Sequence, residues 1–292
     1  MSDDDTPICP EDSAIALPLG IVRGMSAERY HAIAAMSASG LKRMARSPAH
    51  FFGLQLDPSR PTGGETTPAL AFGTLFHVAL FEPDQIAARY VVKPGGLDGR
   101  TKEGRAWLAE HADRAVISGA DLESARVMAR QARALPEVAE LMADGYGESS
   151  AFWVDDDTGE MCKCRPDWTS PVGDGVILVD GKSCQDASAE GFGRAIWNYG
   201  YHLQASWYID GFEAATGLRV HGFVFAAVES AWPHAAAAYM LGDDVLDHAR
   251  RENRRLLNLY AECKRTGVWP GYGSAIQLIN LPAWAQRQLE DA

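Results

Sequence analysis

The chain has 292 residues, of which 47% are apolar and 23% charged, a composition that excludes a disordered or fibrous protein. No apolar run reaches the roughly 18–20 residues that a membrane helix needs. Residues 3–5 are acidic where a signal peptide would be basic. The five cysteines are an odd number, which does not suggest a disulfide framework and favours a cytoplasmic location.

The formal net charge of −12 argues at first sight against a nucleic-acid partner. The charge is unevenly distributed, however. Residues 37–105 contain 9 basic and 6 acidic side chains, whereas the whole chain contains 27 and 39. Any basic surface must therefore be local and must come mainly from this segment.

A flexible arm followed by one domain is the organisation that the composition predicts. Residues 1–27 are rich in Asp, Pro and Ser without periodicity, whereas 28–292 carry helical and strand-like patterns. In the first half, helices are predicted from Ser37 or Ser39 to Ser47-Pro48, from Pro68 to Glu82-Pro83, from Arg100–Arg105 onward, and over 121–143, where Pro136 kinks or splits the helix.

The apolar period changes after this long helix, which indicates strands. Turns are predicted at Asp155–Gly159 and Ser170–Gly175. The predicted strands are Ser150–Val154, Met161–Arg165, Val176–Asp180 and segments near 220–228 and 235–241, and the predicted helices are 188–197, 201–216 and 243–266. This order predicts an α/β domain with a helical N-terminal portion.

Charged residues follow one apolar strand. Alternation places Asp180 and Lys182 on the same face as Val176 and Leu178, and Asp167 lies thirteen residues before Asp180, at the end of a predicted neighbouring strand. Two carboxylates beside a sheet are typical ligands of Mg²⁺, and a lysine there can polarise a water or offset transition-state charge. Taken alone, the pattern is more often that of a salt bridge at a strand end.

Three further residues make a site more plausible than an isolated salt bridge. Gln204 and Tyr208 are four residues apart on a predicted helix, so both point to one side. His77 lies in a helix that is otherwise almost wholly apolar. A single histidine in such a helix is more often a packing residue than a ligand.

Longer runs of the sequence resemble a known family. They cover about residues 28–215 and occur in this order: Tyr30–Ile33, Ser37–Lys42, Ser47–His50, Ala71–His77, Asp98–Gly104, Glu148, Phe152-Trp153, Thr158-Gly159, Lys163–Trp168, Asp180–Lys182 and Tyr201–Ala205. Together they resemble the RecE-type exodeoxyribonucleases. The resemblance implies a PD-(D/E)xK restriction-endonuclease-like core, related to lambda exonuclease and RecB nuclease domains, with a mixed central sheet flanked by helices.

The resemblance also implies roles for individual residues. Mg²⁺, with Mn²⁺ as a substitute, would be the cofactor. The implied metal ligands are His77, Asp167, Asp180 and the Gly181 carbonyl, and the other implied catalytic residues are Lys182, Gln204, Tyr208 and Glu148. Asp180 stands where many PD-(D/E)xK nucleases have Glu, a variation that the RecE type shares.

Basic residues in isolation more often form a solvated surface, but in a nuclease core they become the candidates for binding the DNA backbone. The residues assigned to DNA or 5′-phosphate binding are Ser37, Ser39, Lys42, Arg43, Arg46, Arg100, Lys102, Arg105 and Arg165. Ser39 starts a predicted helix, where free backbone N–H groups favour an anion. The alternative is that Ser37 and Ser39 only cap the helix.

Cysteines and tryptophans are expected mainly in the core. Cys162, Cys164, Cys184 and Cys263 lack any C-x₂-C pair, so buried free thiols are predicted and no iron–sulfur cluster is expected. The tryptophans predicted to pack rather than to stack on bases are Trp107, Trp153, Trp168, Trp197 and Trp207.

The leading hypothesis is an Mg²⁺-dependent enzyme that resects linear duplex DNA 5′ to 3′ for recombination. The alternatives are a RecB-like endonuclease or flap nuclease with the same site, and a non-catalytic scaffold that binds DNA ends. By resemblance, the expected partners are duplex DNA ends, a RecT-like annealing protein of a phage or prophage system, and further copies of the chain in a ring of three or four.

Overall fold

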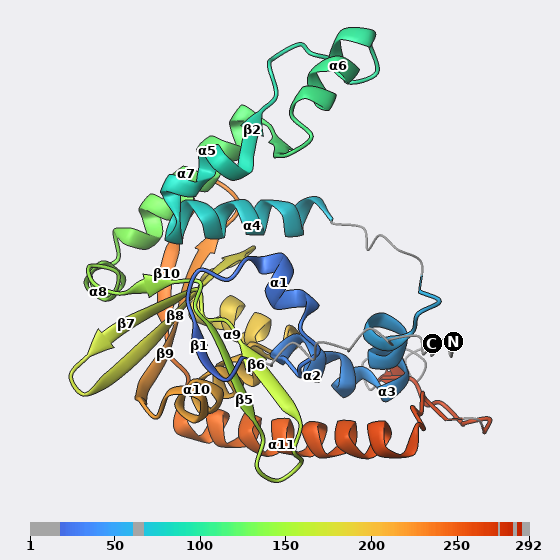
Figure 1. The fold of residues 1–292 in the computed structure, drawn as a ribbon. Helices are drawn as coiled ribbons and strands as arrows, with labels where there is room; N and C mark the ends of the chain where they lie inside the picture. Colours follow the sequence, from blue (N-terminus) through green and yellow to red (C-terminus); the bar gives the residue numbers. More distant parts are fainter. Residues whose placement is uncertain (1–17, 61–66, 274, 283–284, 288–292) are drawn as a thin grey trace, which may run out of the picture.

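A computed structural model describes residues 18–60, 67–273, 275–282 and 285–287 (Figure 1). Its central sheet has five strands in the order β10-β9-β8-β7-β4. Their bounds are β10 (Ala236–Tyr239), β9 (Arg219–Glu229), β8 (Gly175–Cys184), β7 (Trp168–Val172) and β4 (Tyr146–Gly147). The β8–β9 pair is parallel and the other pairs are antiparallel, which confirms the predicted mixed sheet.

Two smaller sheets accompany the central one. An antiparallel sheet has the order β1 (Gly20–Val22), β5 (Ser150–Val154), β6 (Met161–Cys164), and β2 (Tyr90–Val92) pairs in parallel with β3 (Ala115–Ile117). The prediction of a flexible arm over 1–27 is therefore wrong for Gly20–Val22, because this strand pairs with β5 and is half-buried. Residues 1–17 of that arm lie outside the described residues.

Helices cover both faces of the central sheet (Figure 1). Alternate residues of β8 separate the two layers, since Leu178 belongs to one apolar cluster and Val179 to the other. The Leu178 cluster includes residues of α2 (Ala38–Arg46), α9 (Ala189–Asn198), α10 (Tyr201–Thr216) and α11 (Asp243–Thr266). The Val179 cluster includes residues of α4 (Pro68–Phe81) and α7 (Gly119–Arg133).

The remaining helices are short. They are α1 (Ala27–Ala32), α3 (Pro48–Phe51), the π-helix Phe52–Leu56, the 3₁₀ turn Pro83–Gln85, α5 (Ile86–Arg89), α6 (Lys102–Glu110) and α8 (Pro136–Leu141). The predicted division of the long helix at Pro136 is confirmed, because α7 ends at Arg133 and Pro136 begins α8. None of the helices in the described part of the chain is both long and apolar enough to cross a membrane.

One strand of the central sheet contradicts the sequence prediction. A turn was expected at Ser170–Gly175, but Ser170, Pro171 and Val172 belong to β7 and pair with β8. Pro171 is tolerated because β4 pairs only with Trp168 and Thr169, so the outer edge of β7 is free where Pro171 lacks its N–H.

The predicted burial of cysteines and tryptophans holds in part, because Cys184 and Trp107 are only half-buried and Trp197 is exposed. Cys162 and Cys164 are fully buried, and Trp153 packs against Trp207 in the same core. Trp197 is 66% exposed, so its predicted place in the core is wrong. Its helix, α9, turns Ile196 rather than Trp197 toward the core.

A glycine allows α4 to lie close to the end of β8. A Cβ atom at Gly181 would lie 3.0 Å from Phe81 and 3.1 Å from Leu80, which is tighter than ordinary van der Waals contact. Gly181 therefore fixes the distance between β8 and the helix that carries His77.

We expect Gly181→Ala to lower the free energy of unfolding by about 1–3 kcal/mol, because the added methyl group overpacks this contact. Gly193→Ala in α9 is the matched control, since a Cβ there meets open space and should stabilise the helix slightly. Urea denaturation of both variants measures the difference. A Gly181→Ala variant as stable as Gly193→Ala would contradict the close-packing role.

Candidate active site

Two carboxylates lie opposite each other at the end of the β7–β8 hairpin. Trp168 pairs with Val179, so the next step of the antiparallel register sets Asp167 against Asp180. The Gly181 N–H donates to Asp167 Oδ2 at 3.0 Å. Asp167 thus comes directly before β7, the strand that pairs with β8. The sequence predicted it instead at the end of the strand Met161–Arg165, which belongs to the other sheet.

Asp180 is the buried centre of the site, with 1% exposure. Gln204 of α10 donates from Nε2 to Asp180 Oδ1 at 2.6 Å. The Lys182 ammonium forms an ion pair with the other carboxylate oxygen and lies 4.8 Å from the centre of the Tyr201 ring. Asp180, Lys182 and Gln204 are therefore brought together as the sequence predicted.

His77 faces this pair of carboxylates from the opposite layer. Its Nδ1 lies 3.3 Å from Asp167 Oδ2, while its ring contacts Phe76 and Phe81 edge-on. The structure therefore gives His77 both a packing contact and a polar contact with the site.

The charges of the site compensate each other in a buried setting. Burial works to raise the pKa of Asp167, but His77, Lys182 and the Gly181 N–H outweigh it, and the pKa is lowered. Burial raises the pKa of Asp180, and the charge of Asp167 adds to this effect against the opposing effect of Lys182. Burial lowers the pKa of Lys182 and of His77, but the adjacent carboxylates dominate and raise both.

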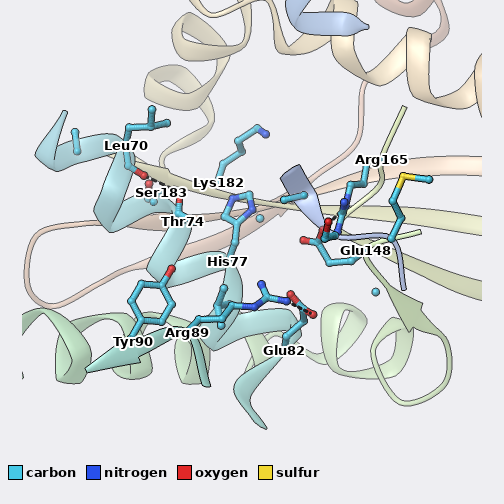
Figure 2. A pocket seen from close by; sticks show the side chains of 18 of the residues that line it. Leu70, Thr74, His77, Glu82, Arg89, Tyr90, Glu148, Arg165, Lys182 and Ser183 are labelled. Atoms are coloured by element: carbon cyan, nitrogen blue, oxygen red, sulfur yellow. Dashed lines mark hydrogen bonds and ion pairs between the residues drawn. The ribbon is translucent and has the colours of Figure 1, made fainter. Parts of the chain in front are cut away.

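A cavity of about 750 Å³ opens onto these residues, lined by His77, Gly181 and Lys182 among others. Figure 2 shows Glu148 and Arg165 facing each other beside His77. The Glu148 backbone has a φ of 54° and its N–H donates to the Asp167 carbonyl at 3.1 Å. Glu148 and Arg165 are thus an ion pair on the cavity wall, and burial, with the charge of Asp167 adding to it, raises the pKa of Glu148 despite Arg165.

The start of α2 lies beside the cavity. Lys42 Nζ is 5.3 Å from the centre of the Tyr201 ring, and burial, followed by the charge of Lys182, lowers the pKa of Lys42 to about 8. Ser37 caps α2 by accepting from the Gly40 N–H at 3.2 Å, and its hydroxyl is 3.0 Å from that of Ser39. Ser37 is therefore the helix cap, and 5′-phosphate binding at this helix end stays a prediction.

Other predicted residues do not join this group. Figure 1 shows α6, which carries Lys102 and Arg105, beyond α4 and away from β8, and Arg100 nearby pairs with Asp98 at 2.9 Å. Arg46 on α2 donates to the Tyr272 hydroxyl at 3.3 Å, and Arg43 is half-buried.

Tyr208 packs edge-on against Phe223 in the core below the site. Burial raises its pKa well above the ordinary value, and the charges of Asp180 and Asp167 add to this effect. Its hydroxyl therefore stays protonated close to the carboxylates.

Sequence reasoning missed the part played by Tyr201 and the pair Glu82–Arg89. The ring of Tyr201 contacts both Lys182 and Lys42, and its position three residues before Gln204 on one helix could have indicated a shared face. Glu82 and Arg89 pair at 2.8 Å on the cavity wall (Figure 2), and no sequence pattern marked them.

The donors of this site fit a hard divalent cation. Asp167 and Asp180 offer carboxylate oxygens and Gly181 a carbonyl, the ligand types that Mg²⁺ prefers. The raised pKa of Asp180, which follows from burial and from the charge of Asp167, is the effect expected where a cation would stabilise two ionised carboxylates. Within the described residues, no three His, Cys, Asp or Glu side chains converge as ligands, and Lys182 and His77 pair with the carboxylates instead.

Comparison with protein families gives a match over residues 37–282, to the PDDEXK-like domain of unknown function (DUF3799). The chain belongs to this family. The match confirms the resemblance to PD-(D/E)xK proteins and the predicted fold class. The chain therefore carries a PD-(D/E)xK nuclease domain, the domain type of a phosphodiester hydrolase.

Solved structures agree on the fold. A "putative exonuclease" from Eubacterium rectale is 15% identical with a TM-score of 0.57, covering 88% of this chain and 96% of its own. An alkaline exonuclease from Laribacter hongkongensis is 16% identical, covering 63% of this chain and 96% of its own, and its TM-score of 0.28 is too low to support an inference. The comparison with curated proteins gives no match.

We expect Asp167→Asn, Asp180→Asn and Lys182→Met each to lower the rate of phosphodiester cleavage by about 100-fold or more, because the three original side chains act as one unit. For the same reason, pairs of these changes should cost little more than single ones. Asp174→Asn, in the exposed turn at the other end of the same hairpin, is the control. The measurement is the cleavage rate of labelled DNA beside a circular dichroism spectrum. A well-folded Asp180→Asn variant with more than a tenth of the original rate would contradict the assignment.

Proposed function

We propose that the protein is a divalent-metal-dependent exodeoxyribonuclease that degrades linear duplex DNA from 5′ to 3′. The observation that carries the proposal is the junction of Asp167, Asp180 and Lys182 with Gln204, next to a cavity that Lys182 lines. Resection of ends for recombination, a RecT-like annealing partner and a ring of three or four copies belong to the same proposal, supported by the family resemblance of the sequence.

Asp167, Asp180, the Gly181 carbonyl and His77 would hold the cation. When bound, it supplies Lewis-acid polarisation of a phosphate oxygen and lowers the pKa of a water. Lys182 places an ammonium group beside the cavity, where it offsets negative charge on the phosphate. Gln204 fixes the orientation of the Asp180 carboxylate, and Tyr201 limits the movement of Lys182.

The size of the cavity supports an enzyme that acts at strand ends. A volume of about 750 Å³ is that of a small-ligand pocket and accommodates one or two nucleotides. The proposal is that one strand leaves its complement to reach Lys182, since an end separates more easily than the interior of a duplex. The fold shared with the Eubacterium rectale protein described as an exonuclease supports the same reading.

Labelled linear duplex tests the polarity and the metal requirement together. We expect mononucleotides to be released from 5′-labelled ends with Mg²⁺ or Mn²⁺, and no cleavage with Ca²⁺ or EDTA, because the oxygen donors suit small hard cations. The controls are closed circular duplex and the Lys182→Met variant.

Cleavage of the closed circle at a similar rate would favour the endonuclease or flap-nuclease reading. Binding of ends without any cleavage in Mg²⁺ or Mn²⁺ would favour the scaffold reading. Release of the 3′ label first would contradict the proposed polarity.

Lys42 should contact a phosphate group, because its ammonium lies 5.3 Å from the centre of the Tyr201 ring, which lines the cavity. We expect Lys42→Met to weaken binding of linear duplex in Ca²⁺ and to reduce the slope of log K against log salt by about 1. Arg105→Met on α6 is the matched control and should leave the slope unchanged. Equal slopes for the two variants would contradict this role.

A further inference from the structure

Aromatic rings continue from the candidate active site to the protein surface. The Tyr201 ring, 4.8 Å from Lys182 Nζ, lies 5.6 Å from the ring of Tyr199 at an angle of 34°. Tyr199 is 63% exposed, and Trp197, two residues earlier in the chain, is 66% exposed. One exposed ring, Tyr199, thus contacts the ring that lies over Lys182, and a second exposed ring, Trp197, stacks on His202 of the same helix as Tyr201.

The exposed indole of Trp197 is held in place rather than free to rotate. It stacks on His202 with a centroid distance of 5.2 Å and an interplanar angle of 5°. His202 is itself 6% exposed, and its Nδ1 is 3.1 Å from the Ile196 carbonyl. Ile196 packs against the core, which anchors α9 while Trp197 points outward.

A cation accompanies these rings. Gly200, with a φ of 62°, forms the corner between α9 and α10 that brings Tyr199 and Tyr201 together. A Cβ at Gly200 would lie 3.4 Å from Lys42 Cε, so the Lys42 side chain runs along this corner. Exposed rings beside a positive charge are the combination that binds single-stranded nucleic acid, with bases stacked on rings and phosphates near cations.

A strand that enters the cavity unpaired would need a surface on which its bases can stack. A strand that separates from its complement loses the stacking of its bases at the point where it enters the cavity. Aromatic side chains can replace that stacking for any base, because every base has a π-face. Tyr199 contacts the ring of Tyr201, which lines the cavity, and Trp197 precedes Tyr199 by two residues at the end of α9.

We propose that Trp197 and Tyr199 form a stacking platform for the unpaired bases of the DNA strand that enters the cavity. The proposal rests on the proposed nuclease function and adds a binding site for bases to it. Neither residue takes part in the chemistry at Asp180 and Lys182.

Binding of two single strands of equal length in Ca²⁺, oligo-dT and a strand of abasic sites, separates base contacts from phosphate contacts. We expect the original protein to prefer oligo-dT by about 5-fold or more. Trp197→Ala and Tyr199→Ala should remove this preference, and Trp197→Phe should keep most of it. Trp232→Ala is the matched control, because Trp232 is 80% exposed but lies in the loop after β9.

Three outcomes would overturn the platform. Equal binding of both strands by the original protein would show that bases are not contacted, while cleavage of linear duplex in Mg²⁺ would leave the nuclease function standing. Unchanged preference in Trp197→Ala and Trp197→Phe would exclude this ring. A lower sedimentation coefficient for Trp197→Ala with unchanged base preference would assign the rings to contact between copies. Failure of the original protein to bind either strand or to cut duplex would instead remove the nuclease proposal itself.

Discussion

A buried carboxylate needs a cation and a hydrogen-bond donor nearby, and Asp180 has both in Lys182 and Gln204. Alternation along β8 puts Asp180 and Lys182 on one face, so α10 has to lie across that face to supply Gln204. The need of the buried Asp180 for partners therefore accounts both for the position of α10 and for the polar end of β8, which is otherwise apolar.

The site is assembled from both layers of the fold. The layer of α10 reaches Asp180, while α4 on the other side brings His77 to Asp167. Gly181 lies between Asp180 and Lys182 in the chain, and its missing side chain lets α4 approach. The absence of a side chain at Gly181 thus determines how closely α4, which carries His77, approaches β8.

Local periodicity predicted much of this arrangement. Strand spacing places Asp180 and Lys182 on one face, whereas the junction of Gln204 and His77 with the carboxylates came only from the family resemblance. β7 was missed because Ser170 and Pro171 are typical turn residues, and only the short reach of β4 explains why they fit a strand. The basic residues of α6 were grouped with those of α2 because they are near in sequence, but the distance between these helices depends on tertiary structure.

The sequence separations within the site determine when it can form during folding. Asp167 and Asp180 meet through a short hairpin, but Gln204 lies 24 residues beyond Asp180, and β9 joins β8 only after the α9–α10 crossover. Contacts between distant segments form later than local ones, because a longer loop must close first. The hairpin of a nascent chain can thus bring the carboxylates together before Gln204 is in place. The hydrogen bond from Gln204 to Asp180 therefore requires the whole segment from β8 through α10 to be folded.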